Sequence, residues 1–145
     1  SLLIKLFIGL LIVLFCLFFA YIIFAITKQR NVKKRNKSFQ DENYHASIPR
    51  MFAYSVFLLH YGGISERGGS MYSYLDEIGQ VYGEEYVEMF KKVTIINQEC
   101  LYSDNQIKIE KYEQMKHFMD YTLSKVFQSK NMLQRLKMKL WDFIY

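Results

Sequence analysis

The chain contains few of the residues that interrupt helices, with one Pro and seven Gly among 145 residues. Hydrophobic residues make up 51% of it and aromatic residues 17%. This composition excludes a disordered chain, a collagen-like repeat and a Gln/Asn-rich low-complexity segment. No stretch alternates apolar and polar residues in the way that a half-buried strand does. The sequence therefore predicts an all-α protein.

Cysteine and histidine are also scarce, with two Cys and three His. Cys16 lies in an apolar run and Cys100 in an expected helix, so they cannot plausibly form a disulfide, and this usage fits a reducing compartment. None of His45, His60 and His117 lies within four residues of another His or of a Cys, so the spacing of a zinc site is missing. We expect no metal and no cofactor.

Two patterns resemble catalytic motifs but lack essential parts. Gly63 and Gly68 have the spacing of a phosphate-binding loop, yet the Lys followed by Ser or Thr that the motif requires is absent. Cys100, His117 and Asp120 are the residue types of a thiol nucleophile, its base and an orienting acid. Cys100, however, belongs to an apolar stripe, where cysteine is usually a small buried side chain. We therefore expect no catalytic residue in this chain.

A long apolar run near the N-terminus is the most informative part of the sequence. Residues 6–26 contain no charged residue, and as a helix they would be roughly 31 Å long, close to the hydrocarbon thickness of a bilayer. A core helix rarely stays apolar on every face over this length, and the apolar part of a cleaved signal peptide is shorter. We expect residues 1–27 to form a retained transmembrane anchor. The chain begins with Ser1 rather than Met, so this could be the last span of a longer protein.

Positive charge is concentrated directly after this run. Residues 28–50 carry a net charge of +5, whereas the rest of the chain beyond residue 50 carries −1. Basic residues beside a span stay on the cytoplasmic side, which predicts a single-pass plasma-membrane protein with its N-terminus outside and residues 28–145 inside. The cluster could also attract anionic headgroups, although a topology signal alone explains it. Its members are Lys28, Arg30, Lys33, Lys34, Arg35 and Lys37.

Residues 28–47 are expected to be a basic juxtamembrane linker, and residues 48–145 a small cytoplasmic bundle of about four helices, the last one long. Ile48-Pro49-Arg50 should begin the first and most buried helix, because Pro is tolerated in a first turn. A glycine-rich loop over residues 62–69 should follow, and then a short helix that Ser70 or Ser73 caps and Gly83 ends.

The third helix should run from about residue 84 to residue 101. We expect it to bury a stripe made of Tyr86 or Val87, Phe90, Val93, Asn97 and Cys100. Ser103, with Gln106 three positions later, has the spacing of a capping box for the last helix. That helix could be continuous or could consist of two nearly collinear helices broken near residues 129–131. Its apolar positions are Met115, Met119, Thr122, Val126, Leu133, Leu136 and Leu140.

The end of the last helix combines basic and apolar residues on a candidate interaction face. Such a face fits a helix that lies on a membrane or in the groove of a protein partner. A solvated helix end whose cations favour the helix dipole explains it equally well. The residues are Lys130, Leu133, Arg135, Leu136, Lys137, Lys139, Leu140 and Trp141.

The order of these features carries a resemblance to a known family. The features are, in order, a span, a basic stretch, residues 50–54 (Arg-Met-Phe-Ala-Tyr) at a helix start, a glycine-rich turn, and residues 99–103 (Glu-Cys-Leu-Tyr-Ser) before a long last helix. This order resembles the C-terminal domain of unknown function that follows the last span in bacterial membrane-bound transglutaminase-like proteins. The resemblance covers nearly the whole chain. It implies that the Cys/His/Asp chemistry lies in a domain upstream of the span, so no catalytic residue carries over, and that an AAA-type ATPase could be a partner.

We therefore expect a membrane-anchored, non-catalytic interaction or coupling module of a bacterial cell-envelope protein, which links a membrane or extracellular part to a cytoplasmic partner. The alternative is a small structural subunit of a multi-component membrane transport or secretion complex, whose span packs on other membrane subunits. Lipid and protein are the expected partners. Nucleic acid is not, because the excess positive charge belongs to the flank of the span rather than to the domain.

Overall fold

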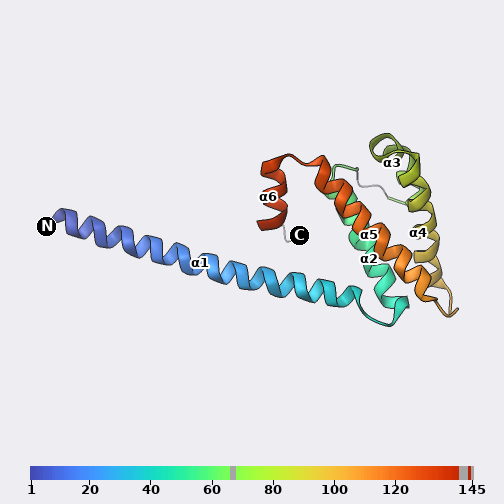
Figure 1. The fold of residues 1–145 in the computed structure, drawn as a ribbon, viewed down its shortest axis with the longest axis horizontal. Coiled ribbons are helices and arrows are strands. Elements are labelled where there is room, and N and C mark those ends of the chain that lie inside the picture. Colours follow the sequence, from blue (N-terminus) through green and yellow to red (C-terminus); the bar gives the residue numbers. More distant parts are fainter. Residues whose placement is uncertain (66–67, 141–143, 145) are drawn as a thin grey trace.

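The computed structural model describes residues 1–65, 68–140 and 144, and over these residues the chain is all-α, with six α-helices and no strand (Figure 1). A very long first helix leads into a small bundle, as the sequence predicts for the fold class. The α-helices are α1 (Leu2–Phe39), α2 (Tyr44–Tyr61), α3 (Leu75–Tyr82), α4 (Glu84–Tyr102), α5 (Ile109–Ser129) and α6 (Met132–Leu140). A single 3-10 turn, η1 (Met71–Tyr74), precedes α3.

The segment expected to be a linker is largely helical, and the helix expected to begin at residue 48 begins earlier. Residues 28–39 continue α1, and α2 begins at Tyr44, so only residues 40–43 separate the two helices. Residues 28–39 hold neither Pro nor Gly, and extending an existing helix costs little compared with starting one. Pro49 consequently lies inside α2 rather than in its first turn.

The bundle is built around α2, which contacts α1, α4 and α5. Aromatic side chains from three helices meet in its core: the Phe90 ring lies 6.0 Å from Phe52 and 6.2 Å from Phe118, measured between ring centres. On α4, the expected stripe is buried as predicted. Its members are Tyr86, Val87, Phe90, Val93, Asn97 and Cys100.

Two helix boundaries depend on glycine as expected, and one expected cap is wrong. Gly83, at φ 90°, separates α3 from α4, and α2 ends at Gly62, which Gly63 follows at φ 103°. A positive φ is a conformation that glycine adopts without strain. Ser103, by contrast, terminates α4, and its hydroxyl oxygen accepts from the Asn105 amide at 3.1 Å. The last long helix, α5, begins only at Ile109.

The break between α5 and α6 lies where the sequence indicates, but the two helices are not collinear. Figure 1 shows α6 turning back from the end of α5 toward α1. Asn131 and Gln134 form a capping box at the turn: the Gln134 amide donates to Asn131 Oδ1 at 2.9 Å, and the Asn131 amide donates to Gln134 Oε1 at 3.1 Å. A second small core of Leu58, Val126, Met138 and Ile144 holds this returning segment against the bundle.

Candidate interaction surfaces

The basic cluster after the apolar run divides between solvent and the bundle. Its exposed side chains are Arg30, Lys33, Lys34 and Lys37. Arg35 turns inward instead: its guanidinium lies 4.6 Å from the centre of the Tyr54 ring and donates to the carbonyl oxygen of Ile144 at 3.4 Å. Lys28 is half-buried. One member of the cluster therefore ties α1 to the bundle, and the four exposed members remain available to anions.

The candidate face at the end of the chain also separates into two sides. Lys130 donates to the Tyr61 carbonyl oxygen at 3.0 Å, and Arg135 donates through Nε to the Phe127 carbonyl oxygen at 3.0 Å. Both cations are thus used in holding α6 to the bundle. Leu133, Leu136 and Leu140 point away from it, and Trp141 lies outside the described residues.

The outward side of α6 is the most exposed apolar surface of the bundle. Its residues, together called the α6 stripe below, are 86%, 79%, 52% and 50% exposed in the order Met132, Leu133, Leu136 and Leu140. Met132 was not singled out from the sequence. Its helical spacing could have identified it, because the positions of these four residues place them within about a third of the circumference of a helix.

A shallow apolar groove of about 740 Å³ lies between α1 and α6. On the α1 side it is lined by the last turns of the apolar run and the first residues after it, including Leu17, Tyr21, Phe24 and Lys28. Leu140 lines it on the α6 side. The last turn of α6 is therefore level with the end of the apolar run, although more than a hundred residues separate the two in sequence. We call this the α1–α6 groove.

A second groove, of about 580 Å³, lies between α2 and α4 and is called the α2–α4 groove below. Phe52 and Val56 of α2 form one wall, and Leu101 and Tyr102 of α4 form part of the other. Leu101 is 52% and Tyr102 85% exposed. Asn97 lines the same groove while being only 9% exposed, and its Oδ1 accepts no hydrogen bond from the described residues.

The three histidines have structural surroundings rather than a shared site. Both ring nitrogens of His45 face carbonyl oxygens, Nδ1 that of Cys100 and Nε2 that of Asn105, each at 2.9 Å. These two hydrogen bonds raise the pKa of His45 above 6.5, because both nitrogens can donate only when the ring is charged. His60 lies near Ile64 and Tyr74 at the end of α2.

The remaining residues considered for chemistry do not form a common arrangement in the described part of the chain. Cys100 is buried, and burial raises the pKa of its thiol, which disfavours the thiolate that a nucleophile needs. His117 is exposed on α5, where its ring stacks on Tyr121. Within the residues that the structure describes, no three His, Cys, Asp or Glu side chains are grouped so that they could hold a metal ion.

Among the described residues, α1 is the one helix that is long and apolar enough to cross a membrane, and none of its most apolar window is buried against the bundle. No family model, curated protein or solved structure matches the chain. The candidate functional surfaces of the chain are therefore the two apolar grooves and the α6 stripe.

Proposed function

We propose that this chain is a membrane-anchored, non-catalytic interaction module of a bacterial cell envelope, whose helical domain lies in the cytoplasm and binds a protein partner in the α2–α4 groove. The observation that carries the proposal is the combination of apolar walls with Asn97, a residue that lines the groove and whose buried Oδ1 accepts no hydrogen bond from the described residues. An unpaired buried amide oxygen costs free energy in the isolated chain. A partner that supplies a hydrogen-bond donor recovers this free energy when the Asn97 side chain turns its Oδ1 toward the groove on binding.

The lining of the groove suits an amphipathic helix. Helix-binding grooves take apolar side chains spaced at one helical turn and use a few polar groups to fix the register. Phe52, Val56 and Leu101 would contact the apolar face of such a helix, and Asn97 would set its register. Tyr102, with most of its surface exposed at the rim, is of a residue type enriched at protein interfaces.

The proposed coupling to the membrane runs through α1. This helix continues without interruption from the apolar run to Phe39, which is buried in the core and accepts a hydrogen bond from the Tyr112 hydroxyl at 2.7 Å. It also contacts α2, which forms one wall of the groove. A partner bound to that wall is therefore joined to the span by packed helices rather than by a flexible tether.

The resemblance to transglutaminase-like membrane proteins suggests an AAA-type ATPase as the soluble partner. A second candidate function, a structural subunit of a transport or secretion complex, is favoured by the bare surface of the span: every residue from 1 to 21 is exposed within this chain. That surface could contact other spans as readily as lipid. The two candidates differ in which part of the chain binds protein.

Photo-crosslinking of the full chain in its native membrane tests the proposal. A benzoylphenylalanine replaces Gln98 in the α2–α4 groove, and in a matched control it replaces Lys92, which is exposed elsewhere on α4. We expect one discrete adduct with a soluble protein from position 98 and none from position 92. The substitution Leu101→Asp should abolish that adduct, because a charge would enter the apolar wall.

Equal labelling from positions 98 and 92, or no adduct from either, would contradict the groove as the binding site. A third probe at Ile12, which is exposed in the apolar run, addresses the second candidate. Adducts with polytopic membrane proteins from position 12, without any from position 98, would favour a subunit of a membrane assembly.

A further inference from the structure

The α6 stripe covers only one side of its helix. Met138, on the opposite side, is fully buried in the second core, and Arg135 and Lys139 reach back over the Phe127 ring at 5.0 and 5.3 Å. The bundle thus fixes the rotation of α6 about its own axis. The side that carries Met132 and Leu136 must face away from the bundle.

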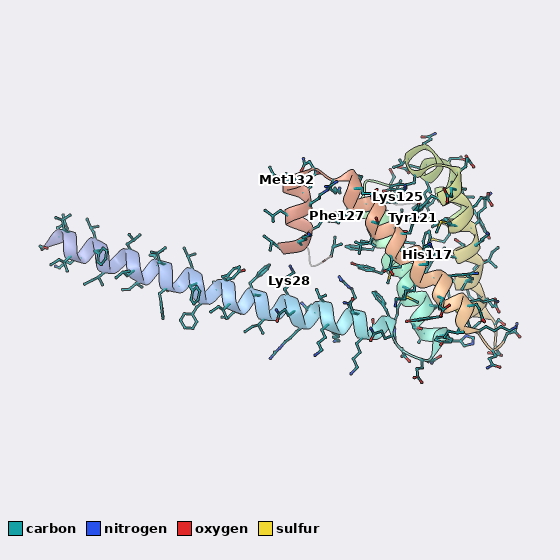
Figure 2. The ribbon with its side chains drawn as sticks, viewed as in Figure 1. Lys28, His117, Tyr121, Lys125, Phe127 and Met132 are labelled. Carbon is teal, nitrogen blue, oxygen red and sulfur yellow. The ribbon has the colours of Figure 1, made fainter. Side chains whose placement is uncertain are left out.

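The position of α6 along α1 determines what the α6 stripe faces. Figure 1 shows α6 on the side of the bundle nearest the N-terminal half of α1, running across the direction of α1. In Figure 2, Met132 lies at the end of α6 farther from α1, and Lys28 lies below its other end. With α1 crossing a bilayer, α6 lies parallel to the membrane plane, and the side turned away from the bundle faces the bilayer.

Along the axis of α1, the last turn of α6 lies beside the boundary between the apolar run and the basic residues that follow it. Leu140 shares the α1–α6 groove with Tyr21 and Phe24 inside the run and with Lys28 just beyond it. The exposed stripe is therefore continuous with the exposed surface of the span. A lipid surface that covers the span as far as residue 26 reaches the stripe as well.

Positive charge beside the stripe favours anionic headgroups. At 100° per residue, the exposed Lys137 flanks the stripe on the side opposite to Lys139, and residues 132–140 contain no acidic residue. Arg30 and Lys33, both exposed, follow on α1 directly after the groove. An apolar stripe with basic residues beside it is the pattern of helices that lie in the membrane interface.

We propose that α6 is an interfacial membrane helix: Met132, Leu133, Leu136 and Leu140 insert among the acyl chains beside the span, and Lys137 binds the phosphates of anionic phospholipids. The proposal depends on α1 crossing a membrane but not on the α2–α4 groove. The domain then has two membrane contacts, the span and α6, which together fix its tilt.

Fluorescence of the full chain in lipid nanodiscs tests this. The polarity-sensitive dye NBD is attached at Leu136→Cys in a Cys16→Ser background, and Cys100 is retained because it is buried. The matched control carries the dye at Ser124→Cys on the exposed side of α5. We expect a blue-shifted emission at position 136 with several-fold stronger quenching by nitroxide-labelled acyl chains than at position 124. Quenching by aqueous iodide should be weaker at position 136 than at position 124.

Equal lipid quenching at the two positions overturns the proposal. A dye at position 136 that is shielded from iodide but not reached by the lipid quencher also overturns it, since this indicates a protein on the stripe, either a second copy or a partner. A second label at Leu133→Cys repeats the measurement independently of any disturbance at position 136.

The headgroup contact is tested by comparing phosphatidylcholine nanodiscs with nanodiscs that also contain phosphatidylglycerol. We expect stronger lipid quenching at position 136 in the anionic discs, and we expect Lys137→Gln to remove that increase. Lys116→Gln, on the exposed side of α5, should leave it unchanged. An equal effect of both substitutions would show that general charge rather than Lys137 is responsible and would overturn this part. Crosslinking from position 98 is a separate measurement, so failure here and failure of the proposed function are distinguishable.

Discussion

His45 is held between two carbonyl oxygens, those of Cys100 and Asn105. The neighbouring carboxylates of Asp104 and Glu99 act in the same direction as these hydrogen bonds and raise the pKa of the ring. Because the folded-state pKa lies above 6.5, the stabilisation is complete below that value and is lost as the pH rises through the raised pKa. The side chain thus fastens the start of α2 to the α4–α5 connection most strongly in mildly acidic solution.

The substitution His45→Ala should therefore lower stability in a pH-dependent way. We expect the urea midpoint to fall relative to the unmodified chain at mildly acidic pH, and the difference to shrink as the solution becomes alkaline. Urea unfolding followed by circular dichroism across this range provides the measurement. A difference that is constant with pH would mean that the ring acts only through packing.

Tyr86 and Thr122 form a buried hydroxyl pair between α4 and α5, with their oxygen atoms 2.5 Å apart. Tyr86→Phe removes one partner and leaves the Thr122 hydroxyl buried, which should cost about 1–2 kcal/mol in the free energy of unfolding. In the Tyr86→Phe background, Thr122→Val should lower the free energy of unfolding by less than it does in the unmodified chain, because the Thr122 hydroxyl has already lost its partner. A double-mutant cycle in urea measures this, and strict additivity of the two changes would contradict it.

Asn97 also allows a test at a single residue, but here we expect the substitution to raise rather than lower stability. Asn97→Leu removes an amide whose Oδ1 is buried without a partner, so we expect the free energy of unfolding to rise by about 1 kcal/mol. The same substitution should remove the adduct formed from position 98, since the partner loses its polar contact. A variant that is both more stable and fully competent in crosslinking would show that the amide has no part in binding.

At the scale of the element, α6 depends on the reciprocal cap made by Asn131 and Gln134. Asn131→Ala should destabilise the first turn of α6 by about 1 kcal/mol. Amide hydrogen exchange of residues 132–136 should accelerate, while exchange in α4 stays slow, because α6 contributes only Met138 to a core that α2 and α5 also supply. Acceleration across the whole bundle would instead show that α6 is part of its cooperative unit.

The elements also show which structural features can be predicted from local sequence. The stripe on α4 and the turn at Gly83 follow from helical spacing and from one residue's backbone freedom, so both were predictable. Ser103 and Asn131 each have a Gln three residues later, yet only Asn131 caps a helix. The difference is tertiary: Ile107, buried in the core, lies in the non-helical segment between α4 and α5.

The direction of α6 was not predictable for the same reason. The sequence placed Leu133, Leu136 and Leu140 on the continued apolar stripe of α5, with Arg135 and Lys139 as part of one basic face. The turn at residues 130–131 reverses the chain, so the leucines become exposed and the cations contact Phe127. Periodicity identifies which residues share a side of a helix, but the turn decides what that side meets.

For the whole molecule, the proposed orientation gives a direct prediction. Tyr102→Cys, at an 85% exposed position, should react with a membrane-impermeant maleimide in inside-out membrane vesicles but not in intact cells. The physical reason is the clustering of basic residues on one flank of the span. A cysteine placed at Leu2 serves as the opposite control, and labelling of position 102 in intact cells would reverse the assigned topology.

Because α1 is one uninterrupted helix, the rotation of the span about its own axis is fixed relative to the bundle. Each helical residue advances about 1.5 Å and turns about 100°, so the count of residues between the apolar run and Phe39 sets which side of the span lies over Leu140. Two residues inserted after Asn31 would turn the span by about 200° against the bundle. A partner seated on α2 could in this way sense, or impose, torsion and axial displacement of the span.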